Sequence, residues 1–400
     1  MFQKLNKVLV FFIFSLSCST VSFADGSIYS LRGLGLQYHY YGNRATGMGG
    51  AIIAISDPND LNWLNPAALA GINRVRFSSQ FIMQTLNIEN SNQKHKTNYA
   101  NFNGFMGAFP ISSGIGIGFG LQPITKINYS FETLDTIGVY DYTTSVNSFG
   151  GLNRVFISSG FKIHSRLRLG VSFSYVFGKA NEDWRVNYVS ERFRDTRDEF
   201  SSRFKGFSTR FGAVLNPIKG LNIGGVYETK YDLSRNFEEV YFGNQTITST
   251  SDFDFPGLWG VGISYQMKQK FLLAFDYVNQ DWSTYPSNTQ NSISEFTNFE
   301  RISFGLEYTP AVDKFAKFLQ RSKYRIGFAM EQPYVLDYSG RELSTIFVTA
   351  GLGIPFASRS GSIDLAIEYG KRGSVSDNTF EEQIFRLSFY VTGGELWFQR

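Results

Sequence analysis

Apolar and polar residues alternate with a period of two along most of the chain beyond residue 72. In 167–177 the odd positions carry leucine, valine or an aromatic residue, and most residues between them are small or polar. The stretches 115–121, 271–278 and 363–369 repeat this pattern. A period of two places successive side chains on opposite faces of a strand. The longer runs have roughly 10–13 residues, which suits a tilted strand that crosses a bilayer better than the short strands of a soluble sandwich.

About fourteen such strands are predicted, an even number as in bacterial outer-membrane barrels. Their expected ranges are 73–86, 98–109, 113–127, 153–163, 166–178, 204–216, 219–232, 255–267, 270–282, 299–309, 322–332, 343–356, 361–371 and 382–392. Short links alternate with longer polar ones, which we expect to be cell-surface loops at 128–152, 179–203, 233–254 and 283–298. Residues 310–321 break this rule and are expected to form a short amphipathic helix, with Val312, Phe315, Ala316 and Leu319 on one face.

The N-terminal part of the chain does not have this strand pattern. Residues 25–72 are rich in glycine and contain Asn65-Pro66 and short apolar pieces, so we expect them to form a plug, or hatch, inside the barrel of residues 73–400. Residues 1–24 read as a cleaved signal peptide, because Lys4 and Lys7 precede an apolar stretch and small residues precede Asp25. The expected fold class is therefore all-β: a transmembrane antiparallel barrel of about fourteen strands with a hatch in its lumen, exported to the outer membrane.

Composition supports this prediction and narrows the function. The chain has 40 Phe, 22 Tyr and 39 Gly, yet its mean hydropathy is only −0.16, as expected where alternate residues face lipid. A net charge of +4 gives no electrostatic case for nucleic acid. The single cysteine, Cys18, lies in the expected signal peptide, so thiol chemistry is excluded from the mature chain. We find no metal-ligand cluster, no cofactor motif and no recognisable catalytic spacing, and expect a protein that is not an enzyme.

Short motifs in the predicted hatch and strands carry a family resemblance. Residues 42–51 (GNRATGMGGA), Ser56-Asp57 and residues 63–70 (WLNPAALA) resemble the hatch of the outer-membrane long-chain fatty-acid transporter (FadL) family, which includes importers of aromatic hydrocarbons. The hatch-motif positions are Gly47, Gly49, Gly50, Asn65, Pro66 and Ala67. Residues 276–283, 305–310, 351–355, 368–373 and Trp397-Phe398 resemble the later strands of the family, and especially a branch that also contains the shuttle barrel of type IX secretion. The chain departs from the family at Ala68, where better-known members have glycine, and in the charged segment 179–203.

The resemblance implies capture of a hydrophobic molecule by external loops, binding in the lumen over the hatch, and lateral exit into the outer leaflet. Such an exit needs a break in strand pairing, for which Gly118, Gly120 and Pro123 in the third strand are the candidates. Pro123 read on its own is equally compatible with a strand-end proline at the membrane interface.

The hatch and the inward strand faces supply the candidate binding residues. Leu34, Leu36, Tyr38 and Tyr40 alternate with glycine and polar residues, and either line an apolar pocket or pack the hatch against the wall. Asn65-Pro66 is interpreted as a turn, with a ligand contact as the alternative. Inward charges are expected to form ion pairs that brace the lumen, although one arginine is also suited to a substrate carboxylate. These charges are Arg168, Arg210, Glu228, Lys230, Asp276, Glu307, Arg325, Glu331, Asp364, Glu368 and Arg386.

Two functions follow from these features. The first is passive uptake of small hydrophobic compounds, fatty acids or aromatics, with outer-membrane lipid and such compounds as partners and the barrel-assembly machinery needed during biogenesis. The alternative is a secretion-associated or scaffold barrel whose charged external loops bind a protein partner.

Overall fold

The computed structural model describes residues 26–31, 33–39, 41–137, 140–190, 192–241, 245–283, 296–311, 316–356 and 361–395. The expected signal peptide, Tyr40 and Trp397-Phe398 lie outside these ranges. Among the helices of the described residues, none combines the length and apolar character needed to cross a membrane.

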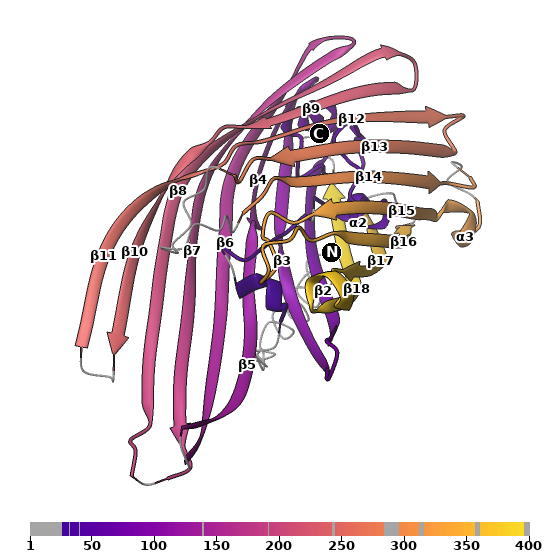
Figure 1. Ribbon diagram of the computed structural model, residues 1–400. Coiled ribbons are helices and arrows are strands. Elements are labelled where there is room, and N and C mark those ends of the chain that lie inside the picture. The colour runs from indigo at the N-terminus through magenta and orange to yellow at the C-terminus, as the bar shows by residue number, and fades with distance from the viewer. Residues whose placement is uncertain are drawn as a thin grey trace, which may run out of the picture.

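A closed antiparallel wall of fourteen strands confirms the predicted fold class. Three wall strands are broken once, so the wall has seventeen labelled segments (Figure 1). These are β2 (Val75–Glu89), β3 (Lys94–Ser112), β4 (Ile115–Pro123), β5 (Thr125–Ile137), β6 (Tyr140–His164), β7 (Leu167–Tyr188), β8 (Thr196–Ile218), β9 (Leu221–Glu228), β10 (Tyr231–Tyr241), β11 (Gln245–Phe255), β12 (Leu258–Met267), β13 (Phe271–Gln280), β14 (Phe299–Tyr308), β15 (Lys323–Gln332), β16 (Thr345–Pro355), β17 (Gly361–Arg372) and β18 (Glu381–Glu395). The segments β4–β5, β9–β10 and β11–β12 are the broken strands, and β18 pairs with β2 from Glu381↔Glu89 to Glu395↔Val75 to close the barrel.

One side of the barrel is much taller than predicted. β6, β7 and β8 have 25, 22 and 23 residues, whereas β12 to β15 have 10 each. A surplus of about 12 residues at about 3.3 Å per residue extends these strands about 40 Å further. The prediction of loops at 128–152, 179–203 and 233–254 is therefore wrong, because the described residues of these segments are mostly strand.

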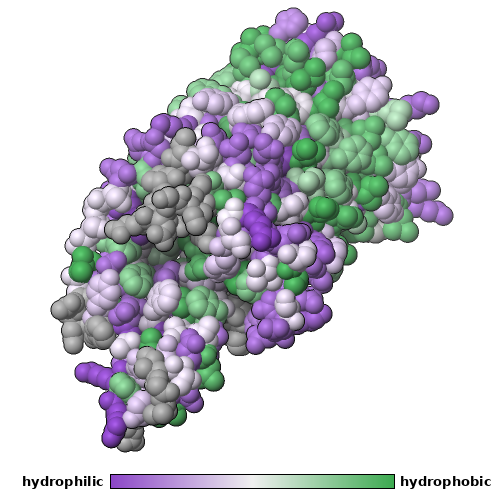
Figure 2. Space-filling view, in the orientation of Figure 1, coloured by the Kyte–Doolittle hydropathy of each residue, from purple (hydrophilic) through white to green (hydrophobic). Residues whose placement is uncertain are grey.

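The physical reason is that a strand outside the bilayer needs no apolar face, while its backbone ladder is still satisfied by its neighbours. We call this extension the wing, made of the described residues of 125–151, 179–205 and 231–255. Figure 2 shows hydrophobic residues gathered over the short-strand side at the upper right, with a largely hydrophilic surface at the lower left, where the wing lies.

The short elements add little to the wall. They are η1 (Ile28–Leu31), β1 (Leu36–Gln37), α2 (Asn43–Gly47), η2 (Pro66–Gly71), α3 (Phe318–Arg321) and α4 (Val375–Asn378). The predicted helix at 310–321 is present only as the single turn α3, and Val312 and Phe315 lie outside the described residues.

The third wall strand is interrupted between β4 and β5. β4 pairs with β3 as far as Phe105↔Leu121 and with β6 as far as Pro123↔Asn153. β5 then continues along β6, but no pairing joins it to β3 within the described residues. β1 of the hatch pairs with β5 instead, through Leu36↔Lys126 and Gln37↔Thr125. The wall therefore has a gap between 94–104 of β3 and β5, and the hatch supplies two residues of pairing at the point where this gap begins.

Candidate transport site: the hatch, the wall gap and the wing cavity

The hatch sits against wall residues that lack side chains. A Cβ added to Gly327 would lie 2.1 Å from the Gly49 nitrogen, and one on Gly224 would lie 2.7 Å from the Ala54 Cα. The wall glycines whose added Cβ would meet hatch backbone are Gly116, Gly160, Gly170, Gly224, Gly305, Gly327 and Gly351, each on a different segment from β4 to β16. The hatch backbone is therefore packed directly on the wall around much of the barrel.

The hatch-motif residues lie within this packing. Gly49 and Gly50 have φ angles of 66° and 97°, which favour glycine, and Gly47 packs on Gly351, since its added Cβ would lie 3.1 Å from the Gly351 Cα. Asn65 is fully buried and caps η2: its Oδ1 accepts from Ala67 N at 3.0 Å. Its Nδ2 donates to the Ile53 carbonyl at 2.8 Å and to the Ala213 carbonyl of β8 at 3.1 Å. Asn65, Pro66 and Ala67 thus form a turn that is tied both to the hatch and to the wall.

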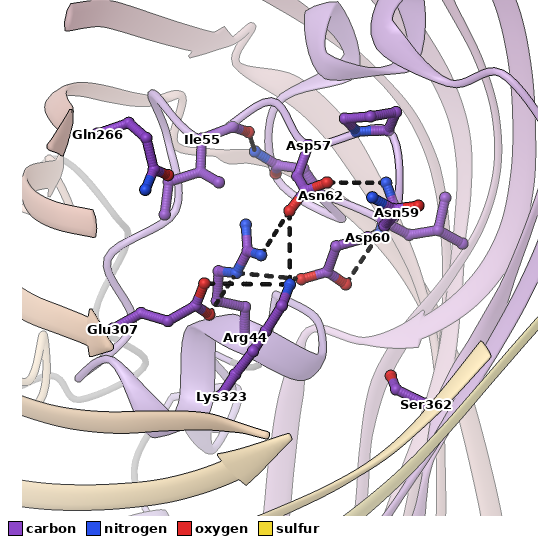
Figure 3. Close-up of polar contacts among 12 residues, drawn as sticks. Arg44, Ile55, Asp57, Asn59, Asp60, Asn62, Gln266, Glu307, Lys323 and Ser362 are labelled. Carbon is purple, nitrogen blue, oxygen red and sulfur yellow. Dashed lines mark hydrogen bonds and ion pairs between the residues drawn. The ribbon is translucent and has the colours of Figure 1, made fainter. Parts of the chain in front are cut away.

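A charged cluster ties the hatch to β14 and β15 (Figure 3). The Arg44 guanidinium of α2 lies 2.6 Å from Asp57, 2.9 Å from Glu307 and 3.6 Å from Asp60. The Lys323 Nζ lies 3.6 Å from Asp57. Burial raises the pKa of Asp57, but the charges of Lys323 and Arg44 outweigh burial and hold that pKa well below its usual range. Burial raises the pKa of Asp60, which has the more distant contact with Arg44.

Asp57→Asn is expected to lower the free energy of unfolding by about 1–2 kcal/mol at pH 7, with part of the effect screened because the Asp57 side chain is 23% exposed. A depressed folded-state pKa stabilises above the unfolded pKa of about 4, and this stabilisation is lost as pH falls towards the folded-state value. Unfolding measured at pH 7 and pH 3 should therefore show a smaller difference between variant and wild type at pH 3. Asp135→Asn, on an exposed wing residue, is the control, and a difference that grows in acid would contradict the argument.

Most of the predicted inward charges contact an oppositely charged side chain or the hatch. Arg210 Nη2 lies 2.6 Å from Glu228, and Arg325 lies 2.8 Å from Glu307 and 2.5 Å from Asp364. Further contacts are Arg386–Glu368, Arg301–Glu331 and Arg168 with the Ser56 hydroxyl. Asp276 accepts hydrogen bonds from Ile52 N and Ile53 N of the hatch, at 2.5 and 2.8 Å.

The prediction that Lys230 faces the lumen is wrong, because Lys230 pairs with Asp254 at an exposed position between β9 and β10. The sequence analysis also did not predict that Arg44, Arg154 and Arg301 pair with the lumen carboxylates of Glu307, Glu228 and Glu331. Of these three arginines, only Arg44 gave a signal in the sequence, because it lies within the hatch motif. Within the described ranges, no group of three or more metal-ligating side chains is arranged to hold a metal ion.

The start of the wall gap is closed by Tyr38 of the hatch together with Tyr99 and Lys126 of the wall. The Ile124 carbonyl, at the break, accepts from Tyr38 N at 2.8 Å. The Tyr38 hydroxyl lies 3.3 Å from that of Tyr99 on β3, and the Lys126 Nζ of β5 lies 3.5 Å from the centre of the Tyr99 ring. Leu36 and Tyr38 are thus brought to the gap.

Pro123 ends β4 beside this closure, and a small cavity of about 30 Å³ there is lined by Tyr38, Pro123 and Ile124. Gly118 and Gly120 lie before the gap, where they pair with Ala108 and Met106 of β3. A Cβ on Gly118 would meet Met106 and the hatch residue Leu69, and one on Gly120 would meet the Phe105 carbonyl.

A second, larger cavity of about 810 Å³ lies between the hatch and the concave face of the wing. Its apolar floor comes from Leu31 and Leu34 of the hatch, with Phe204, Phe253 and Phe296. Leu34 is buried, and its backbone N donates to the Tyr334 hydroxyl at 2.9 Å. Leu34 therefore lines this cavity, whereas Leu36 and Tyr38 lie at the gap.

Comparison with known proteins identifies the family. A family model described as BamG matches residues 1–400. The chain belongs to the BamG family. No curated protein sequence matches this member of the BamG family.

Solved structures show that the BamG-family chain has the fold of FadL-like barrels. It is similar to the toluene transporter TbuX of Ralstonia pickettii, with a TM-score of 0.61 and 15% identity over 89% of this chain and 98% of that one. A FadL homologue of Pseudomonas aeruginosa has a TM-score of 0.62 and 13% identity over 90% of this chain and 99% of that one. The toluene transporter TodX of Pseudomonas putida has a TM-score of 0.60 and 15% identity over the same shares of the two chains. The structures that share this fold are described as toluene transporters, a monoaromatic hydrocarbon channel and a FadL homologue.

Proposed function

We propose that this BamG-family barrel mediates passive uptake of small hydrophobic compounds through the outer membrane, by binding above the hatch and release through the wall between β3 and β5. Capture occurs in the cavity between the hatch and the wing, where Leu34 and three phenylalanines form an apolar floor. An apolar molecule loses about 25 cal/mol for each Å² that it returns to water, so a route from apolar cavity to lipid avoids this penalty.

The wall gap is the observation that carries this proposal. The glycine contacts hold the hatch against the wall at the level of residues 47–70, which favours a lateral route over one straight through the barrel. At the gap, the described residues between the lumen and the outside of the barrel include β1, Tyr38, the Tyr99–Lys126 contact and Ser30, whose hydroxyl bonds the Asn128 backbone of β5. The TbuX and TodX structures, described as toluene transporters, share this fold.

Pro123→Val tests the exit. Valine restores the N–H that proline lacks and favours extended backbone, so we expect the β3–β4 ladder to extend past Leu121 and narrow the gap. Uptake of a radiolabelled aromatic or fatty acid by cells that carry the variant should fall severalfold, while permeation of small hydrophilic solutes stays low. Pro110→Val is the matched control, since Pro110 pairs with Gly116 at the opposite end of the same ladder, away from the gap. Equal uptake by the Pro123 and Pro110 variants would contradict lateral release at this gap.

The wing favours a second candidate function, a barrel that binds a protein partner at the cell surface. Its strands extend far beyond the length that a bilayer requires, and its convex face carries the ion-pair network of Asp183, Arg185, Arg197 and Glu199. Wild-type protein that takes up neither fatty acids nor aromatics, but is recovered from cells in a stable complex, would favour this second function.

A further inference from the structure

The walls of the wing cavity carry more carboxylates than basic groups. Glu182 of β7, Asp198 of β8 and Glu239 of β10 line it, and Arg235 is the basic residue among the described lining side chains. These residues come from three adjacent wing segments, so the carboxylates face one volume rather than one strand.

These carboxylates differ from those of the lumen in their partners. The lumen carboxylates of Glu228, Glu307 and Asp364 each contact an arginine. Within the described residues, no ion pair joins Glu182 or Glu239 to a basic side chain. Glu182 accepts instead from the Tyr129 hydroxyl at 2.6 Å and from the Trp184 indole, and Glu239 accepts from the Tyr241 hydroxyl at 2.9 Å. These donors to Glu182 and Glu239 are neutral, and no basic group among the described residues pairs with either charge.

Aromatic rings lie among the carboxylates. Phe200 and Phe237 stack with ring centres 6.4 Å apart, and Tyr129 and Trp184 line the same cavity. The Arg235 guanidinium lies 4.3 Å from the centre of the Phe237 ring, so one cation already rests on this aromatic surface. Aromatic faces and carboxylates together favour organic cations, because both present negative potential.

We propose that the wing cavity binds an amphipathic organic cation, with its hydrophobic body on the floor of Leu34, Phe204 and Phe253 and its ammonium or guanidinium group among Glu182, Asp198 and Glu239. A volume of about 810 Å³ is suited to a small ligand. This inference rests on the proposed function in taking the cavity as the place of capture, and it narrows the substrate class. A fatty-acid carboxylate would meet like charge in the same walls.

The test uses three probes with the same tail: octyltrimethylammonium, octanoate and 1-octanol. Each is titrated calorimetrically into the full mature chain in lipid nanodiscs, and heats from empty nanodiscs are subtracted. Octyltrimethylammonium should bind on the order of tenfold more tightly than octanoate, and this preference should shrink as salt is raised. The double variant Glu182→Gln/Glu239→Gln should remove most of the preference and leave 1-octanol affinity unchanged.

Glu199→Gln/Glu238→Gln is the matched control, because each residue neighbours a lining carboxylate on the same strand and is not among the lining residues. Equal affinity for the three probes, tighter binding of octanoate, or a parallel loss for all three probes in the lining variant would overturn the proposal. If the protein binds octyltrimethylammonium preferentially but cells that carry it take up no hydrophobic compound, the cavity assignment is supported and the proposed transport function is refuted. Failure of the cavity assignment can therefore be told apart from failure of the transport function.

Discussion

Valine in place of Gly327 is expected to displace the hatch, whereas valine in place of Gly225 is expected to leave it seated. A Cβ at position 327 would lie 2.1 Å from Gly49 N and 2.3 Å from the Met48 carbonyl carbon. Both are backbone atoms, so no side-chain rotation can relieve the clash. A Cβ on Gly225 would have no atom within 4 Å, so this control adds the same residue type to another wall segment, β9, without a clash. Overpacking of this kind is expected to lower the free energy of unfolding by about 3 kcal/mol.

Two measurements separate displacement of the hatch from loss of the barrel. Trypsin should cut near Arg44 in the Gly327 variant and spare it in wild type, and planar bilayers should show ionic conductance only for the variant. A Gly327→Ala variant, with a smaller added group, keeps the test available if the valine variant is not assembled. A Gly327 variant with the thermal stability, protease resistance and low conductance of the Gly225 variant would refute the assigned hatch contacts.

A disulfide between residues 36 and 126 is expected to abolish uptake reversibly. Leu36 and Lys126 are direct partners in the β1–β5 pairing, and paired antiparallel residues have Cα separations of about 4.5–5.5 Å, within the range of disulfides. Leu36→Cys/Lys126→Cys should lock the hatch strand across the start of the gap. Uptake should fall by more than about tenfold in oxidised protein and return on reduction, because a reducing agent breaks only this covalent link.

Thr85→Cys/Asn98→Cys is the control for this lock, since it joins β2 and β3 where they are already paired. The sole cysteine of the chain, Cys18, lies in the expected signal peptide, so no native cysteine is expected to compete for pairing in the mature protein. Oxidised protein of the 36–126 variant that transports as fast as wild type would show that the route does not pass beside β1.

The alternation of side chains was sufficient to predict the wall, and insufficient to predict the wing. In 167–177 the alternation is apolar against small or polar, so both the strand and its lipid-facing side can be read directly. In 179–188 the chain reads KANEDWRVNY, and a polar strand has the same composition as a loop. Its strand character comes from pairing with β6 and β8, which no local window contains.

The candidate sites differ in the same way. The glycines and Asn65 of the hatch form a compact sequence motif, because their roles are largely local: caps, turns and backbone contacts. The acidic cavity was not predicted, since Glu182 and Glu239 lie 57 positions apart and share a face only through the registers of β7, β8 and β10. A shift of one residue in any register would turn a carboxylate to the opposite face. The two-residue β1 strand was missed because two residues carry no periodicity.

The close fit between hatch and wall also constrains the order in which the protein is assembled. The hatch precedes β2 in the chain, and the ladder that closes the barrel joins β2 to β18, the last labelled strand. Wall glycines approach the hatch backbone with no space for even a methyl group, so a completed cylinder has no clearance through which residues 41–72 can later be threaded. The hatch must therefore already lie within the curve of the growing sheet when β18 meets β2. Closure of the seam is then the step that traps it there.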